Sequence, residues 1–168
     1  GPTMSGARSV LAPGGPVGGR AAIGEPTGLR PIPAHKGILM ERVRVTGRSG
    51  HSSDPRLGVS ALEGMHAVVA RLLALRDRLA ESPRDARFEV PHATMNLGRL
   101  VAGDAPNKIC AHAELLLDAR ILPGTDPREI RDAIARAAAD GVASTGLPLS
   151  VEVSEALDAL PPFDGTGD

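Results

Sequence analysis

Residues 109–122 read ICAHAELLLDARIL and form the most regular stretch of the chain. Small or apolar residues take every second position from Ile109 through Leu115 to Ala119, and polar residues such as Glu114 and Asp118 lie between them. A period of two residues places alternate side chains on opposite faces of a β-strand. The pattern therefore predicts a half-buried strand of an antiparallel sheet, with one face packed and the other turned to water.

Upstream of this strand, the sequence predicts another strand and a long helix. The strand covers Ile38 to Thr46, where Leu39 and Val43 share one face. It leads through RSGHSSDPR (48–56) into an amphipathic helix, which Ser82-Pro83 is expected to end. The expected apolar stripe of this helix comprises Val59, Leu62, Met65, Val69, Leu72, Leu73 and Leu79.

The segment before the central strand and the segment after it are also patterned. Phe88 to Leu100 predicts an extended segment, and Pro91 within it favours an edge strand or a bulge. A second helix is expected to begin after Asp126, because aspartate is a favoured N-cap and Pro127 suits the first helical position. Gly141 is expected to end this helix.

A last strand is predicted over 149–153, where Leu149, Val151 and Val153 alternate with polar residues. The tail from Ala156 shows no pattern. The resulting order is strand, helix, strand, strand, helix, strand. One four-stranded antiparallel sheet with two helices on one face buries both helical stripes. The prediction is therefore an α+β, ferredoxin-like βαββαβ fold, whose sheet edges need cover.

Composition argues against several functional classes. Lys and Arg total 19 and Asp and Glu total 20, so the balance gives no case for nucleic acid or an anionic membrane as partner. The chain has two Phe and no Trp or Tyr, which leaves no stacking platform for single strands. Cys110 is the single cysteine and cannot form an internal disulfide, so we expect a cytoplasmic protein. No apolar run approaches the roughly 20 residues of a membrane helix, and no export signal opens the chain.

Three polar residues are candidates for a site. His51 lies between a glycine and two serines after the first strand, Asn107 precedes the central strand, and Arg120 lies near that strand's far end. A histidine, an amide and a guanidinium can bind a carbonyl oxygen and a carboxylate. The same three residues are explained equally well as ordinary exposed polar residues with no function. Ser52 and Ser53 beside His51 also suggest a nucleophile, but sequence neighbours rarely reach triad geometry and no nucleophile elbow surrounds them.

Glu25 is a further candidate because it lies between Gly24 and Pro26 at the end of a short apolar lead. On composition alone, Glu25 is interpreted as a solvated residue in a turn. Motifs for other chemistry are missing: the sequence has no HExxH, no CxxC, no Gly-rich phosphate loop and no adjacent pair of carboxylates.

Several segments together resemble the M20 family of zinc amidohydrolases and peptidases, and within it the N-acyl amino acid deacylases. The resemblance spans about residues 23 to 160. Other members, which share the frame, act on succinyl-diaminopimelate, on acyl amino acids or on dipeptides. The residues that carry it are IGEPT (23–27), AHKG (34–37), GHSSDP with GVSALEGMH (50–66), TMNLGRLVAGDAPNKIC (94–110) and ELLLDARILPG (114–124).

The resemblance implies specific roles. Family members have a catalytic domain with two zinc ions and an inserted domain that serves as lid and dimerisation module. The residue matching His51 reaches into the partner's active site and stabilises the oxyanion. The residues matching Asn107 and Arg120 help to bind a small N-acyl amino acid, and the residue matching Glu25 is a zinc ligand. The resemblance also implies a homodimer that pairs edge to edge through the lid sheet.

The chain is expected to divide into four parts. Residues 1–22 are rich in Gly, Pro, Ala and Arg without periodicity, which predicts a linker or disordered end. The resemblance implies that 23–36 are the edge of the catalytic domain with a hinge, 37–155 the lid and dimerisation domain, and 156–168 a tail leading back to the catalytic domain. The family's other metal ligands and its general base have no counterpart here. We therefore expect this polypeptide alone to hydrolyse nothing. The alternative is a free-standing ferredoxin-like interaction module without catalysis.

Overall fold

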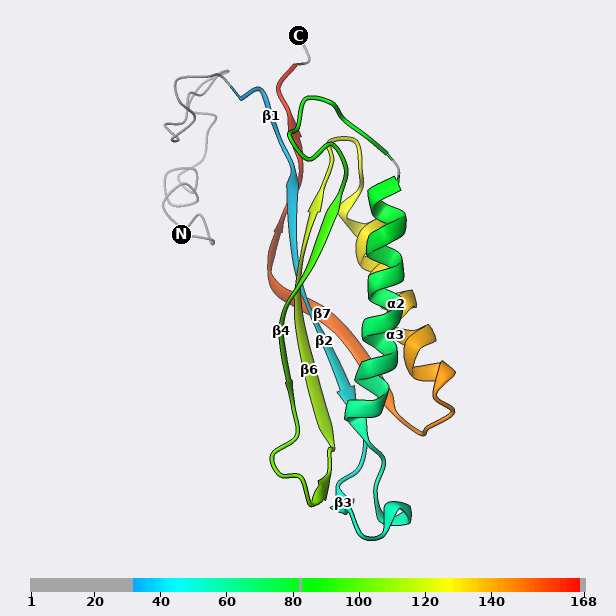
Figure 1. Ribbon diagram of the computed structural model, residues 1–168. Coiled ribbons are helices and arrows are strands. Elements are labelled where there is room, and N and C mark those ends of the chain that lie inside the picture. The colour runs from blue at the N-terminus through cyan, green and yellow to red at the C-terminus, as the bar shows by residue number, and fades with distance from the viewer. Residues whose placement is uncertain (1–31, 82, 167–168) are drawn as a thin grey trace, which may run out of the picture. The chain divides into compact units, whose positions relative to one another are not determined.

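The computed structural model describes residues 32–81 and 83–166, and the compact unit runs from Ala34 to Asp168 (Figure 1). Most of its elements belong to one sheet and two helices. The elements are β1 (Ala34–His35), β2 (Gly37–Thr46), β3 (Gly50–His51), the 3-10 helix η1 (Pro55–Leu57), α2 (Ala61–Glu81), β4 (Thr94–Ala102), β5 (Lys108–Ile109), β6 (His112–Ile121), α3 (Pro127–Ser144), β7 (Ser150–Leu160) and β8 (Phe163–Asp164).

The main sheet has four antiparallel strands in the order β4-β6-β2-β7. Helices α2 and α3 lie together on one face of it (Figure 1). This order and the single helical layer confirm the predicted ferredoxin-like βαββαβ fold. Two further two-stranded pairs, β1-β8 and β3-β5, lie outside the main sheet.

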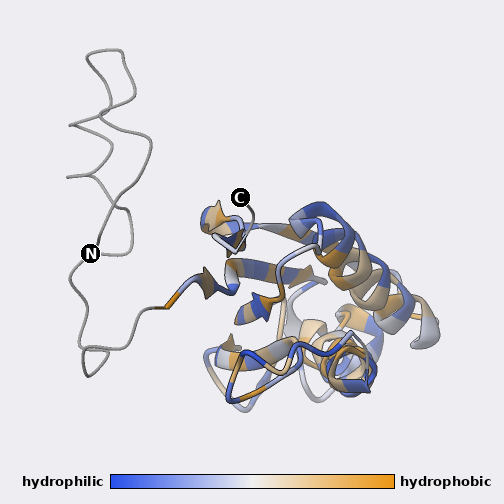
Figure 2. Ribbon diagram, turned by 90° about the horizontal axis from the view of Figure 1, so that it is seen from above, coloured by the Kyte–Doolittle hydropathy of each residue, from blue (hydrophilic) through white to orange (hydrophobic). Residues whose placement is uncertain are grey.

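The core lies between the sheet and the helices, and the period-two pattern places it there. Along β6, Ala113, Leu115, Leu117 and Ala119 are buried, as the alternation predicts. Viewed nearly end-on to the strands, the ribbon shows hydrophobic and hydrophilic residues interspersed in both the strands and the helices (Figure 2). The predicted strand was too long at its start, however. It breaks after Ile109, which pairs with Gly50 in the separate β3-β5 ribbon.

The buried face of α2 differs from the predicted stripe. Leu62 is 48% exposed, whereas Val68 and Leu75 are buried. Helix α2 packs against both the sheet and α3, so its buried face is wider than a single seam and is centred on the side between them. The helix ends at Glu81, shortly before Pro83, as expected.

Helix α3 begins as predicted but continues past Gly141. The Asp126 carboxylate accepts a hydrogen bond of 2.8 Å from the backbone amide of Arg128 and so caps the helix. Gly141 is buried against α2: a Cβ at this position would lie 2.7 Å from the Cα of Val68. The glycine therefore permits close helix contact instead of ending the helix, which runs on to Ser144.

The two outer strands differ in extent from their predictions. β4 begins only at Thr94, because residues 85–91 close a loop in which the amide of Asp85 donates to the carbonyl of Pro91 at 2.7 Å. β4 is an edge strand, and its register shifts between Leu97 and Arg99.

On the opposite edge, β7 continues through residues 156–160, which we expected to be irregular. Register shifts opposite Met40 absorb extra residues and keep β7 paired with β2 as far as Leu160. None of the helices that the structure describes is long and apolar enough to cross a membrane.

Candidate functional site

His51 lies at the tip of a tightly built loop at one end of the sheet (β3 in Figure 1). The base of the loop is closed by the backbone pair Arg48 and Val59, whose two hydrogen bonds measure 2.9 and 2.7 Å. Gly50 permits the loop to fold on itself, since a Cβ there would lie 2.8 Å from the backbone carbon of Leu57. The backbone of His51 is therefore fixed while its side chain is exposed.

Local hydrogen bonds orient the imidazole of His51. Its Nδ1 accepts from the backbone amide of Ser53 at 3.3 Å and lies 2.8 Å from the Ser53 Oγ. Because an amide can only donate, Nδ1 is an acceptor, and a neutral His51 carries its proton on Nε2. The Nε2–H is then a donor toward solvent, which is the role an oxyanion requires. The Ser53 hydroxyl contacts the ring through the same local turn.

The structure brings Asn107 to His51 but places Arg120 elsewhere. The backbone amide of Ser52 donates to the Asn107 carbonyl at 3.1 Å, and β5, which starts one residue later, pairs with β3. Arg120 pairs with Asp118 at 2.9 Å and lies opposite Ile38 at the far end of β6. His112 and Arg120 are eight positions apart along β6, so at about 3.3 Å per residue these two ends of the strand are roughly 26 Å apart.

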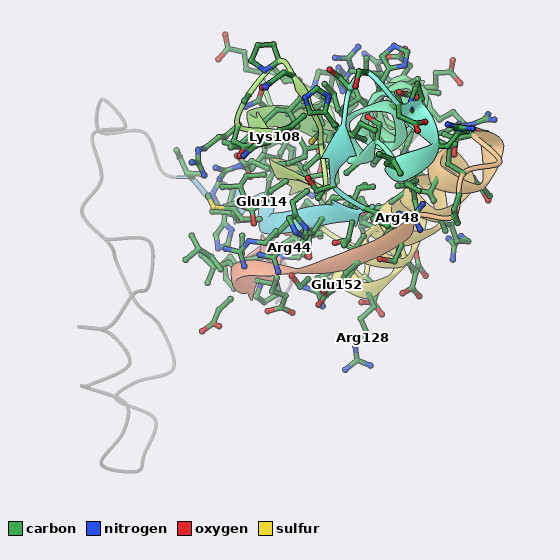
Figure 3. The ribbon with its side chains drawn as sticks, turned by 90° about the horizontal axis from the view of Figure 1, so that it is seen from below. Arg44, Arg48, Lys108, Glu114, Arg128 and Glu152 are labelled. Atoms are coloured by element: carbon green, nitrogen blue, oxygen red, sulfur yellow. The ribbon has the colours of Figure 1, made fainter. Side chains whose placement is uncertain are left out.

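Near the His51 loop, the uncovered face of the sheet is charged and shallowly hollowed. Arg44 of β2 lies between Glu114 of β6 and Glu152 of β7, its partners in register, and its Nη2 is 3.0 Å from the Glu114 carboxylate (Figure 3). An open depression next to β5 is lined by residues of β2, β4 and β6 and by Lys108. His51, Asn107 and Arg120 are not among its lining residues.

One charged residue that sequence analysis missed lies in the core. Glu41 of β2 is fully buried, and its Oε1 accepts from Arg131 Nε of α3 at 2.9 Å. Arg131 Nη2 is also 2.6 Å from the Glu155 carboxylate of β7. Burial raises the pKa of Glu41 above its usual range, and Arg131 opposes that rise. The position was detectable, because Glu41 falls on the same face of the strand as Leu39 and Val43.

The described residues do not fit a zinc site. Among residues 32–81 and 83–166, no group of three or more His, Cys, Asp or Glu side chains could hold a metal ion. Glu25, the predicted zinc ligand, lies outside the described residues. No step of chemistry can therefore be assigned to a metal from this part of the chain.

Comparison with known proteins identifies the domain. The family model described as "Peptidase dimerisation domain", from the M20 group, matches residues 33–145. Curated relatives include acetylornithine deacetylases from Vibrio cholerae (55% identical over 102 residues), Edwardsiella ictaluri (50% over 115) and Klebsiella pneumoniae (44% over 144). These alignments cover 61%, 68% and 86% of this chain but only 27%, 30% and 37% of the relatives. The chain thus spans about a third of their length.

Solved structures share the fold at low identity. An amidohydrolase/peptidase from Burkholderia cenocepacia, described as putative, aligns with a TM-score of 0.61 and 18% identity, covering 79% of this chain and 30% of that one. A tripeptidase from Staphylococcus aureus aligns with a TM-score of 0.55 and 20% identity, covering 79% and 32%. In each case the similar part is a domain within a longer chain.

Proposed function

The chain belongs to the M20 peptidase dimerisation domain family, and from this premise we propose that it is the lid and dimerisation domain of a metal-dependent N-acyl amino acid deacylase. The relatives at 44–55% identity favour acetylornithine deacetylase as the whole protein. That enzyme would hydrolyse N-acetylornithine to ornithine and acetate, a step of arginine biosynthesis. Its two zinc ions, with Glu25 as one ligand, would be held largely outside the described residues. The single cysteine supports a reducing cytoplasm as its location.

One observation carries the proposal: the predicted site residues lie at opposite ends of the domain. His51 and Asn107 share the loop tip, and Arg120 lies at the end where β1 and β8 connect the domain to the rest of the chain. A small substrate cannot span that distance. We propose that Arg120 binds the substrate carboxylate in its own subunit, and that His51 and Asn107 act in the partner's site, with His51 Nε2–H stabilising the oxyanion.

The same proposal requires a homodimer, and the β4 edge is the better candidate for its interface. Leu100 and Val101 of β4 are 49% and 48% exposed, and Leu62 at the start of neighbouring α2 is 48% exposed. The β7 edge carries acidic residues, including Glu152 and Asp158. Two copies of β7 would bring like charges together, whereas β4 carries one charge, Arg99. Strand addition at β4 also covers its unpaired backbone groups.

Subunit complementation tests this arrangement. Full-length His51→Ala and Arg120→Ala proteins are purified, mixed under conditions that exchange subunits, and assayed for deacetylation of N-acetylornithine. Each variant alone should be nearly inactive. A hybrid dimer has one site with an intact Arg120 of its own and an intact partner His51, so random exchange should restore roughly one quarter of wild-type activity.

A mixture that stays inactive, although mass spectrometry detects the hybrid, would refute the assignment of the two residues to different subunits. Activity of wild-type protein toward dipeptides but not toward N-acetylornithine would move the substrate to another member of the family. The Arg128→Ala variant is the matched control, because Arg128 points away from the protein (Figure 3).

A further inference from the structure

Arg87 donates more side-chain hydrogen bonds than any other residue in the described part of the chain, at the end of the domain opposite His51. Its Nε and Nη2 donate to the two carboxylate oxygens of Asp85 at 3.0 and 2.7 Å. Its Nη1 and Nη2 donate to those of Asp164 in β8, both at 3.0 Å. Such two-pronged pairs hold both partners in one orientation. Arg87 therefore joins the loop after α2 to β8, across 77 residues of sequence.

Lys36 attaches the same loop to the other connecting strand. It lies between β1 and β2, and its Nζ donates to the carbonyl oxygens of Val90 at 2.8 Å and His92 at 2.6 Å. The ammonium group also lies 5.6 Å from the centre of the Phe88 ring. Residues 85–92 thus contact the strand that brings the chain into the domain and the strand that takes it out.

The pairing of β1 with β8 is too short to hold these strands by itself. Only Ala34 with Asp164 and His35 with Phe163 are in register, and the His35 and Phe163 rings stack with their centres 5.7 Å apart. Isolated two-stranded pairs are marginal in water even when longer. The side-chain contacts of Arg87 and Lys36 are therefore needed to keep β1 and β8 together at the edge of the domain.

We propose that Lys36, Asp85, Arg87 and Asp164, which we call the connector clasp, fix both connecting strands to the domain so that they move with it as one rigid body. The inference rests on the proposed function in one respect. The direction in which the two connecting strands leave the domain matters only if the domain is a lid that moves relative to a catalytic domain. The clasp sets that direction by holding both connecting strands against residues 85–92. Arg87 and Lys36 act here as positioning residues.

Hydrogen exchange of the 168-residue chain, followed by mass spectrometry, tests the clasp without any assay of activity. In Arg87→Ala, amides of β1, β8 and residues 85–93 should exchange about tenfold faster, whereas those of α2 and β6 should not change. Arg87→Lys keeps the charge but loses the two-pronged geometry, so it should give an intermediate increase. Lys36→Met should speed exchange in the same segments, and Arg128→Ala should have no effect.

Two results would overturn the proposal. Unchanged exchange in β1 and β8 in both Arg87→Ala and Lys36→Met would show that the strands are held by other contacts. An equal acceleration throughout the domain, or failure of both variants to fold, would show that these residues support the whole fold and not a local clasp. A full-length protein without deacylase activity would contradict the proposed function but leave this measurement unaffected.

Discussion

The buried pair of Glu41 and Arg131 gives the sharpest prediction about stability. Replacing Arg131 with methionine keeps most of the side chain's apolar length and removes the charge that compensates a fully buried carboxylate. Breaking a buried ion pair from one side costs about 3–5 kcal/mol. The contact with Glu155 adds little, because that side chain is 44% exposed and such pairs contribute roughly 0–1 kcal/mol. We therefore expect Arg131→Met to lose about 3–5 kcal/mol of unfolding free energy at pH 7.

The converse substitution should be milder. Glu41→Leu leaves Arg131 with Glu155 as a partner and with partial access to water, since its side chain is 29% exposed. In the double variant Glu41→Leu/Arg131→Met, no uncompensated charge remains buried. Its stability should lie within about 1 kcal/mol of wild type or exceed it. The coupling between the two positions should therefore be large and easily measured.

The pH dependence follows from the raised pKa of Glu41. An acid whose pKa is higher in the folded protein binds protons more readily when folded, so its charge destabilises the fold above that pKa. This loss of unfolding free energy shrinks as pH falls through the pKa of Glu41 in the folded protein toward its ordinary pKa of 4.5. Removing Arg131 raises the pKa of Glu41 further. The difference in unfolding free energy between wild type and Arg131→Met should therefore become smaller as the pH is lowered from 7 to 5.

Urea denaturation followed by far-ultraviolet circular dichroism measures these differences, because the chain has no Trp or Tyr for fluorescence. Arg128→Met is the matched control on the exposed side of α3 and should be neutral. A cost below about 1 kcal/mol for Arg131→Met at pH 7 would refute the reasoning, since Glu41 would then be solvated or protonated. A double variant as unstable as the single one would refute it equally.

Three further predictions concern other parts of the molecule. Gly141→Ala places a Cβ against the backbone of Val68 and should cost about 1–3 kcal/mol in the same denaturation assay, and an unchanged midpoint would contradict close helix packing there. Leu100→Lys should shift the chain toward monomer in sedimentation across a concentration series, and an unchanged dimer would contradict an interface at the β4 edge. The Arg87 guanidinium holds the pKa of Asp164 far below its ordinary value of 3.8, so protection of β8 against hydrogen exchange should persist as pH falls through 3.8 and disappear only in stronger acid; loss of protection already above that value would show that the pair does not form.

The period-two pattern predicted the centre of the fold well. Alternation in β2 and β6 places the same residues inward in the sequence and in the structure, because a half-buried strand leaves no other arrangement. The Asp126 cap was equally local and equally predictable. The prediction of buried residues failed where burial depends on two neighbouring elements at once. Leu62 is exposed, contrary to the prediction, because α2 packs against α3 as well as against the sheet.

Polar contacts between residues far apart in the sequence could not be predicted from residue patterns either. Arg131 lies 90 residues from Glu41, and Arg87 lies 77 from Asp164, so neither pair has a local signature. The loop that brings Asn107 to His51 likewise depends on pairing between β3 and β5, each only two residues long. The roles of His51, Asn107, Arg120 and Glu25 stay predictions, which the complementation assay addresses for His51 and Arg120.

The placement of the connecting strands and His51 at opposite ends of the sheet makes the domain a lever. β2 alone has ten residues and so spans about 33 Å, which means that each degree of rotation of the whole domain about its β1–β8 end displaces the His51 end by roughly 0.6 Å. Catalytic groups must be held within about 0.5 Å of a productive position. If His51 serves a partner's site as proposed, the orientation of the domain together with its connecting strands must therefore be accurate to about one degree.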